Sequence, residues 1–286
     1  MRFIILSFLL LLIPSEIIAS SLNVTDEEKV IELVDREYYS IPYTNQFFFD
    51  HEKVEHLTNQ LNEIVFRSPI NASLDESGVI IDGTPGVRLN KEKFLASFIK
   101  YFYDGKSTTI EIPKSPIYPR VSSELLAEIN VNQIGHYATY FDENNEERSH
   151  NILLSTLAIN NHVIFPGEEF SFNQVVGERT EEKGYQKAPV IVKGELAEDI
   201  GGGICQVSST LFNAVHLKGI QMVERYSHSR DVPYVPPGKD ATVSWWGPDF
   251  VFKNTYHMPI LIRSKAIKGK MIIQILSSDA IENTES

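Results

Sequence analysis

The sequence predicts an α+β protein with two folded units, on three observations. The chain has 286 residues, which at about 100–200 residues per domain corresponds to two domains. Helical and strand patterns mix without repeats in residues 22–117, whereas strand and turn patterns dominate from Val163 onward. We therefore expect an N-terminal mixed α/β domain (22–117), a linker or domain edge (118–147), a C-terminal domain (148–280) of mostly antiparallel strands with one or two packed helices, and a short tail (281–286).

The first 20 residues have the pattern of a signal peptide or an N-terminal membrane anchor. Arg2 precedes an apolar run over residues 3–13, and small residues from Ala19 to Ser21 offer a cleavage site. The run is short for a membrane span, which needs about 20 apolar residues. We expect an exported protein that contacts a membrane only through this segment, if the segment is not cleaved.

Residues 22–117 combine three predicted helices with two predicted strands. The first helix begins at a Thr25 N-cap, and the third is stopped by Gly105. The predicted helices cover 25–39, 51–66 and 90–104, and the predicted strands cover 77–83 and 108–113.

The C-terminal domain is expected to surround two helices with strands. The helices cover 150–161 and 205–218, the second with Gly219 at its C′ position. The predicted strands are 166–173, 188–196 (ended by Gly194), 220–228, 240–246, 249–255, 259–267 and 271–277. We expect the last four strands to form an antiparallel meander.

Charge and composition exclude several function classes. The formal net charge is −12 and no basic block is present, which argues against nucleic acid as the main partner. It also argues against charge-driven docking to an anionic membrane or wall polymer. One cysteine and no histidine pair at ligand spacing argue against a metal site, and no phosphate-binding loop is present, so we expect no cofactor.

The only cysteine, Cys205, follows three consecutive glycines and begins a helical pattern. The free N–H groups and positive dipole end of a helix N-terminus stabilise a thiolate and could bind an oxyanion. The candidate oxyanion or substrate-binding residues are Gly202, Gly203, Gln206 and Ser208, of which Ser208 equally suits packing or capping. A buried inert thiol and a ligand-free tight turn remain the structural alternatives.

A cysteine nucleophile also needs a base. His228 ends a predicted strand that could return to the start of the helix, and Asp240 opens the next strand and could orient the imidazole. His216 lies about three turns along the helix and is too far away. An ordinary structural role for His228, or a base drawn from the upstream histidines, stays open.

Residues 148–262 resemble the VanW family. The resemblance rests on "HNILLSTLAIN", "FPGEEFSFNQVVGERTEEKGYQKAPVIVKGEL", "GGGICQVSSTLFNA", "HSRDVPYVPPGKDATV" and "PDFVFKNTYHMPILI". "SWWGPDF", with Trp245 and Trp246, departs from the family pattern. Residues 22–117, and especially the stretch 69–113, look like the peptidoglycan-binding domain that often precedes VanW domains.

The resemblance implies an exported cell-envelope protein of a Gram-positive-type bacterium. It implies L,D-transpeptidation, which forms 3-3 cross-links between peptidoglycan stem peptides, with Cys205 as nucleophile. His228 and Asp240 lie in a matching segment and are carried over as base and orienting residue. The alternatives are a Cys-His peptidoglycan peptidase and a non-catalytic peptidoglycan-binding or assembly protein.

Overall fold

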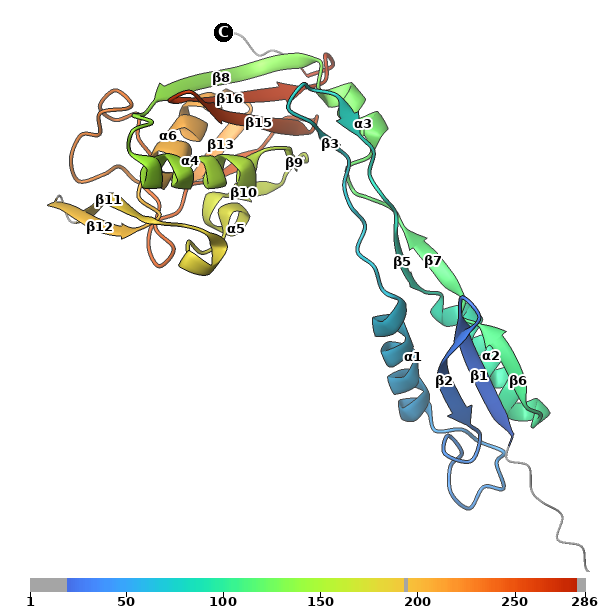
Figure 1. Ribbon diagram of the computed structural model, residues 1–286. Coiled ribbons are helices and arrows are strands. Elements are labelled where there is room, and N and C mark those ends of the chain that lie inside the picture. The colour runs from blue at the N-terminus through green and yellow to red at the C-terminus, as the bar shows by residue number, and fades with distance from the viewer. Residues whose placement is uncertain (1–19, 193–194, 282–286) are drawn as a thin grey trace, which may run out of the picture. The chain divides into compact units, whose positions relative to one another are not determined.

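The computed structural model describes residues 20–192 and 195–281, which form two compact units (Figure 1). The first unit holds the described residues up to Ile70 and Thr84–Pro119, and the second holds Asn71–Gly83 and the described residues from Arg120 onward. The predicted signal or anchor segment lies outside the described residues. No helix in the described ranges has the length and hydrophobicity to cross a membrane.

The first unit is a small sheet packed against two helices. Its three strands run in the order β2-β1-β6, with β1 antiparallel to β2 and parallel to β6. Aromatic residues from α2 and leucines from α1 form its buried core. The elements are β1 (Ser21–Asp26), β2 (Lys29–Asp35), α1 (His51–Val65), β5 (Gly86–Leu89), α2 (Lys91–Asp104), β6 (Thr108–Glu111) and β7 (Lys114–Ile117), with β5 and β7 paired as a separate ribbon.

The two predicted helices α1 and α2 are confirmed, and their ends follow from the sequence. The Asp50 side chain caps α1 by accepting from the N–H groups of Glu52 and Lys53. Gly105 ends α2 in a left-handed conformation with φ 63°.

The helix predicted for residues 25–39 is wrong, because β1 and β2 form a hairpin there. Glu27 and Glu28 both adopt positive φ (49° and 68°), as a two-residue hairpin turn of the I′ class requires. The alternating residues Leu22 and Val24 face the core, whereas Leu33, which fits the helical spacing, is 61% exposed. Alternation with period two therefore decides the structure of this segment.

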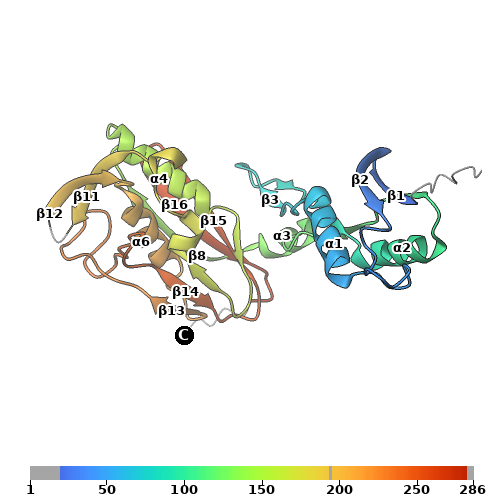
Figure 2. The same cartoon turned by 90° about the horizontal axis from the view of Figure 1, so that it is seen from below.

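The second unit is built on a four-stranded antiparallel sheet of order β8-β16-β15-β9. Helices α4 and α6 pack beside each other against one face of this sheet (Figures 1 and 2). The sheet elements are β8 (Asn132–Tyr140), β9 (His162–Ile164), β15 (Ile260–Ile267) and β16 (Lys270–Ser277), and the helices are α4 (Glu146–Ile159) and α6 (Ile204–Ala214). The predicted α+β class, with mostly antiparallel strands, is confirmed.

Smaller elements complete the second unit. A three-stranded sheet has the order β10-β14-β13, and β11 and β12 form a separate hairpin. These elements are β10 (Glu169–Ser171), β14 (Val251–Asn254), β13 (Ile220–Glu224), β11 (Lys187–Val192) and β12 (Glu195–Ile200), with α5 (Phe172–Val176) and the 3-10 turn Glu181–Lys183. Helix α3 (Ser123–Ile129) packs with β3 (Ser73–Leu74) and β4 (Ile80–Ile81) around Leu261, on β15.

The segment expected as a linker or domain edge, 118–147, contains α3, β8 and the start of α4. β8 pairs with β16 along its whole length, from Lys270 opposite Tyr140 to Ser277 opposite Asn132. Thr139 is its only fully buried side chain, so the strand shows no clear alternation in the sequence. A strand with so weak a pattern resembles a connecting segment in the sequence.

Three other details differ from the prediction. The last four strands do not form one meander, because β14 pairs with β10 and β13 in the second sheet. Residues 240–246 form no strand, although Thr242 N–H donates to Tyr226 O at 2.8 Å. Helix α6 ends at Ala214, and Gly219 instead makes room for the ring of Tyr256, which a Cβ would approach to 2.2 Å. The predicted stop at Gly194 lies outside the described residues.

Candidate functional site

The glycine turn before α6 needs glycine for both conformation and space. Gly201 and Gly203 have φ of 87° and 105°, in the region that favours glycine. A Cβ on Gly203 would lie 2.9 Å from Arg148 Cγ and 3.0 Å from Ile152 Cγ1. Gly203 is also the N-cap of α6 and supplies no capping side chain. The turn therefore brings the start of α6 against α4 at van der Waals distance.

We predict that Gly203→Ala destabilises the protein more than Gly167→Ala. Both positions have positive φ, but a Cβ on Gly167 meets nothing within 4 Å. Gly167→Ala should therefore cost only the backbone strain of about 1–2 kcal/mol. Gly203→Ala adds overpacking of about 1–3 kcal/mol. Urea unfolding of the two variants measures the difference, and equal losses would show that space at Gly203 is not restricted.

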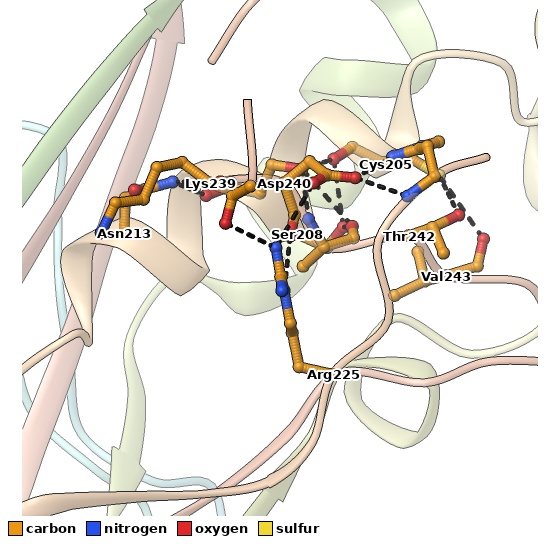
Figure 3. Close-up of polar contacts among 12 residues, drawn as sticks. Cys205, Ser208, Asn213, Arg225, Lys239, Asp240, Thr242 and Val243 are labelled. Carbon is orange, nitrogen blue, oxygen red and sulfur yellow. Dashed lines mark hydrogen bonds and ion pairs between the residues drawn. The ribbon is translucent and has the colours of Figure 1, made fainter. Parts of the chain in front are cut away.

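Cys205 is the second residue of α6, and it lines a large cleft. Its Sγ lies 3.5 Å from Val243 O and 3.8 Å from Thr242 Oγ1 (Figure 3). The side chain is half-buried and borders a cleft of about 980 Å³. Trp245 and Trp246, with ring centroids 6.1 Å apart, also line the cleft. A ligand in this cleft can therefore reach the thiol.

The structure brings His228 and Asp240 together with Cys205. His228 Nδ1 lies 2.6 Å from Asp240 Oδ2, and the backbone N–H of His228 donates to the same oxygen at 2.6 Å. The two side chains are only 5% and 8% exposed. His228 also lies close enough to Cys205 to lower the pKa of its thiol, and since Asp240 occupies Nδ1, Nε2 is the nitrogen left for the thiol.

Arg225 holds the Asp240 carboxylate in place. Its Nε donates to Asp240 O at 2.7 Å, and its Nη2 lies 3.3 Å from Asp240 Oδ1 and donates to Gly238 O at 2.8 Å (Figure 3). The guanidinium also lies 4.8 Å from the ring centroid of Phe212, on α6. Arg225, on the chain just after β13, thus links the loop that carries Asp240 to the helix that carries Cys205.

The electrostatics of the three residues favour a thiolate–imidazolium pair. Burial by itself raises the pKa of the Cys205 thiol, but the hydrogen bond and charge of His228 outweigh it and lower that pKa. Burial likewise opposes the charged form of His228, but Cys205 and Asp240 together raise its pKa. Burial also raises the pKa of Asp240, but its bonds to His228 outweigh it and lower that pKa. Both shifts act in the direction that favours the charged forms of the thiol and the imidazole.

We predict fast alkylation of Cys205 by iodoacetamide at neutral pH. An ordinary thiol, with a pKa of about 8.5, is only a few per cent ionised at pH 7. Because the pKa of Cys205 is lowered, the labelling rate should reach half its plateau at a pH clearly below 8.5. Rates measured by mass spectrometry from pH 5 to 10 test this, and a free small thiol serves as the reference. A midpoint at or above 8.5 would identify an inert thiol.

Two other residues predicted for the site, Gly202 and Ser208, are buried and bonded to neighbouring parts of the fold. Gly202 is buried, and its carbonyl accepts from Asn151 Nδ2 at 3.0 Å. Ser208 is fully buried, and its hydroxyl donates to Ala241 O at 2.5 Å. Neither residue borders the cleft, so the structure does not support their predicted contact with a substrate.

Gln206 borders the cleft, but its amide is already fully bonded. Its Nε2 donates to Thr139 Oγ1 and Tyr140 O, both at 2.9 Å, and its Oε1 accepts from Arg148 Nη2 at 2.7 Å. The side chain therefore has no donor left for an oxyanion. Its contacts instead fix the position of Arg148.

Sequence reasoning missed several residues of the cleft. Arg148 and Arg179 border it, as do Tyr234 and Thr242. Arg148 belongs to a segment that reads as a polar loop, and nothing in the sequence places it beside Cys205. Among the described residues no three histidine, cysteine or carboxylate side chains gather as metal ligands.

Comparison with known proteins identifies the family. The VanW-like protein family matches residues 147–276, which include the cysteine, the histidine and the aspartate of the site. Protein YoaR of Bacillus subtilis, itself uncharacterized, is 54% identical over 282 residues, covering 99% of this chain and 93% of its own length. The vancomycin B-type resistance protein VanW of Enterococcus faecalis is 27% identical over 135 residues, covering 44% of this chain and 49% of its own length. No solved structure matches significantly. With the family match spanning the whole site and a relative aligned over nearly its full length, this chain belongs to the VanW family.

Proposed function

We propose that this protein is a cysteine-dependent acyltransferase of the bacterial cell wall, acting as an L,D-transpeptidase on peptidoglycan stem peptides. The observation that carries the proposal is the group of Cys205, His228 and Asp240 at the edge of an open cleft. A thiol, a base beside it and a carboxylate that orients the base are the parts that covalent acyl transfer requires.

In the first step the Cys205 thiolate attacks the carbonyl carbon of the third residue of a donor stem. The negative charge moves to the carbonyl oxygen, which needs a hydrogen-bond donor. At the second position of α6 the N–H of Cys205 has no partner one turn back within the helix, so it is the proposed donor. The C–N bond then breaks, and protonated His228 gives its proton to the departing amine of the terminal D-amino acid.

In the second step an acceptor amine resolves the thioester. The neutral amine attacks the thioester carbonyl and gives its proton to His228, and the C–S bond breaks to restore the thiolate. One amide bond is lost and one is formed, so the reaction needs no energy source or cofactor. Asp240 stabilises the imidazolium in both steps.

The substrate class rests on the family. A relative carries the name of a vancomycin resistance protein, and this family link suggests a role related to the cell wall. An apolar segment at the N-terminus of the sequence supports export to the cell envelope. The cleft, with Trp246 88% exposed at its wall, has room for a peptide of several residues. A peptidoglycan-binding role for the N-terminal domain is part of the same proposal.

Purified protein incubated with a defined stem tetrapeptide and an acceptor stem tests the proposal. We expect release of one D-amino acid per turnover and formation of a 3-3 linked dimer, both detected by mass spectrometry. Tripeptide without dimer would instead identify a peptidase, since water then replaces the amine. Binding of stems without any bond cleavage would identify a non-catalytic wall protein and would overturn the proposal.

A further inference from the structure

Two arginines lie beside the glycine turn that precedes Cys205. Arg148 comes from α4, and Arg179 comes from the loop after α5. A Cβ on Gly203 would lie 2.9 Å from Arg148 Cγ, and one on Gly201 would lie 3.2 Å from Arg179 Cβ. Each side-chain stem thus packs on one glycine of the turn, and both arginines border the cleft that Cys205 borders.

Neither guanidinium has a carboxylate partner among the described residues. Arg148 Nη2 donates to the neutral Gln206 Oε1 at 2.7 Å, and Arg179 Nη2 donates to the neutral Asn173 Oδ1 at 2.7 Å. In the described ranges no ion pair within 4.0 Å includes either arginine, in contrast to Arg225 with Asp240.

Arg179 has an unused donor as well. Its Nη1 is buried and lacks a hydrogen-bond partner in the described part of the chain. Asp249, the carboxylate whose charge acts on Arg179, is already occupied by the Ser171 hydroxyl at 2.5 Å and the Asn173 N–H at 2.9 Å. Buried polar groups in proteins are almost always satisfied, so this donor is available to a group bound beside it.

The two cations also lie within electrostatic reach of the thiol. Burial lowers the pKa of both guanidinium groups, and the negative charge of Cys205 acts in the opposite direction on each. An arginine keeps its charge under these conditions. The two positive charges therefore lie near the place where the proposed reaction occurs.

We infer that Arg148 and Arg179 form a carboxylate-binding subsite that holds the free C-terminal carboxylate of the donor stem. The inference rests on the proposed function for its substrate. In a tetrapeptide this carboxylate belongs to the residue directly after the bond that Cys205 attacks, so it must lie close to the thiol. Guanidinium groups match a carboxylate with paired hydrogen bonds. One further residue would move the carboxylate about 3.5 Å along the chain, so the subsite selects tetrapeptide over pentapeptide donors.

Peptide binding to the Cys205→Ala protein tests the subsite without requiring turnover. Calorimetry should compare a stem tetrapeptide, its C-terminal amide, and a tetrapeptide amidated on the side-chain carboxylate of its third residue. We expect the C-terminal amide to bind about tenfold to a hundredfold more weakly, the range for hydrogen bonds to charged groups. Adding Arg148→Gln or Arg179→Gln should weaken binding of the free acid to the level of the amide and leave the amide unchanged.

Several outcomes would overturn the inference. Equal binding of acid and C-terminal amide, or equal weakening of both by the arginine variants, excludes a carboxylate subsite. If only the peptide amidated on its third side chain binds more weakly, the arginines hold that side-chain carboxylate. This result would overturn the assignment to the C-terminal carboxylate. Arg88→Gln, at an exposed position on β5, is the matched control, and Arg179→Lys keeps the charge if Arg179→Gln fails to fold.

A second readout does not involve peptidoglycan at all. Iodoacetate is an anion and iodoacetamide is its neutral equivalent, so the ratio of their rates with Cys205 reports positive charge beside the thiol. We expect this ratio to exceed that of a free thiol and to fall several-fold in each arginine variant but not in Arg88→Gln. A constant ratio would overturn the subsite. An arginine-dependent ratio without any acyl transfer would leave the subsite standing while the proposed function fails.

Discussion

Replacement of Cys205 with alanine is expected to abolish acyl transfer, with a loss of at least about a thousandfold in turnover. The thiol is the only cysteine in the chain and the only sulfur nucleophile in the cleft. Alanine removes both the attacking atom and the thioester intermediate. The rate of D-amino acid release from a stem tetrapeptide, together with the mass of the intact acyl-enzyme, measures the effect.

A serine variant and unfolding curves distinguish loss of the nucleophile from loss of the fold. Cys205→Ser retains a side chain of similar size beside Thr242 and Val243, but a hydroxyl does not ionise near neutral pH, so turnover should fall almost as far. Unfolding curves of both variants should stay close to wild type, because the thiol is only half-buried. An alanine variant that keeps more than a few per cent of the activity would exclude Cys205 as the nucleophile.

The helices were largely predictable because their signals are local. Asp50 as N-cap, Gly105 as terminator and apolar residues at helical spacing fix α1 and α2 from within each segment. The hairpin of β1 and β2 was misread because its turn residues are Glu27 and Glu28, which are rarely found at positive φ. Their conformation is imposed by the pairing of the strands and the burial of one face, which are not local.

The residues of the site likewise divide into those with a local sequence signal and those placed only by the folded chain. Cys205 could be selected from its glycines and its place at a helix start, and His228 and Asp240 from their position shortly after that helix. Which way a side chain points depends on packing, so Ser208 and Gly202 could not be separated from the cleft residues. Arg148 and Arg179 come from segments before the helix, and only the folded chain brings them to the glycine turn.

His228→Gln is expected to reduce turnover by about 10²–10⁴-fold, the range for loss of a positioned general acid and base. Two effects combine, because the imidazolium both lowers the pKa of the thiol and protonates the departing amine. Iodoacetamide labelling separates them. In the variant the pKa of Cys205 should rise, so labelling at pH 7 slows and recovers at high pH. Turnover should not recover at high pH, because glutamine cannot transfer the proton.

Asp240→Asn tests whether the aspartate acts through the histidine. The asparagine keeps the size of the side chain but loses the charge that raises the pKa of His228. The wild-type activity should fall at low pH as the thiolate is protonated, and at high pH as the imidazolium loses its proton. In Asp240→Asn the high-pH limb should move to lower pH, while a purely structural role would lower the rate equally at all pH values. The control variant His216→Gln changes an exposed histidine on the chain just after α6, and it should leave the pH profile unchanged.

The double variant of His228→Gln and Asp240→Asn tests whether the two residues act as one unit. If they do, its turnover should fall little further than that of His228→Gln alone, and fully additive losses would contradict the arrangement.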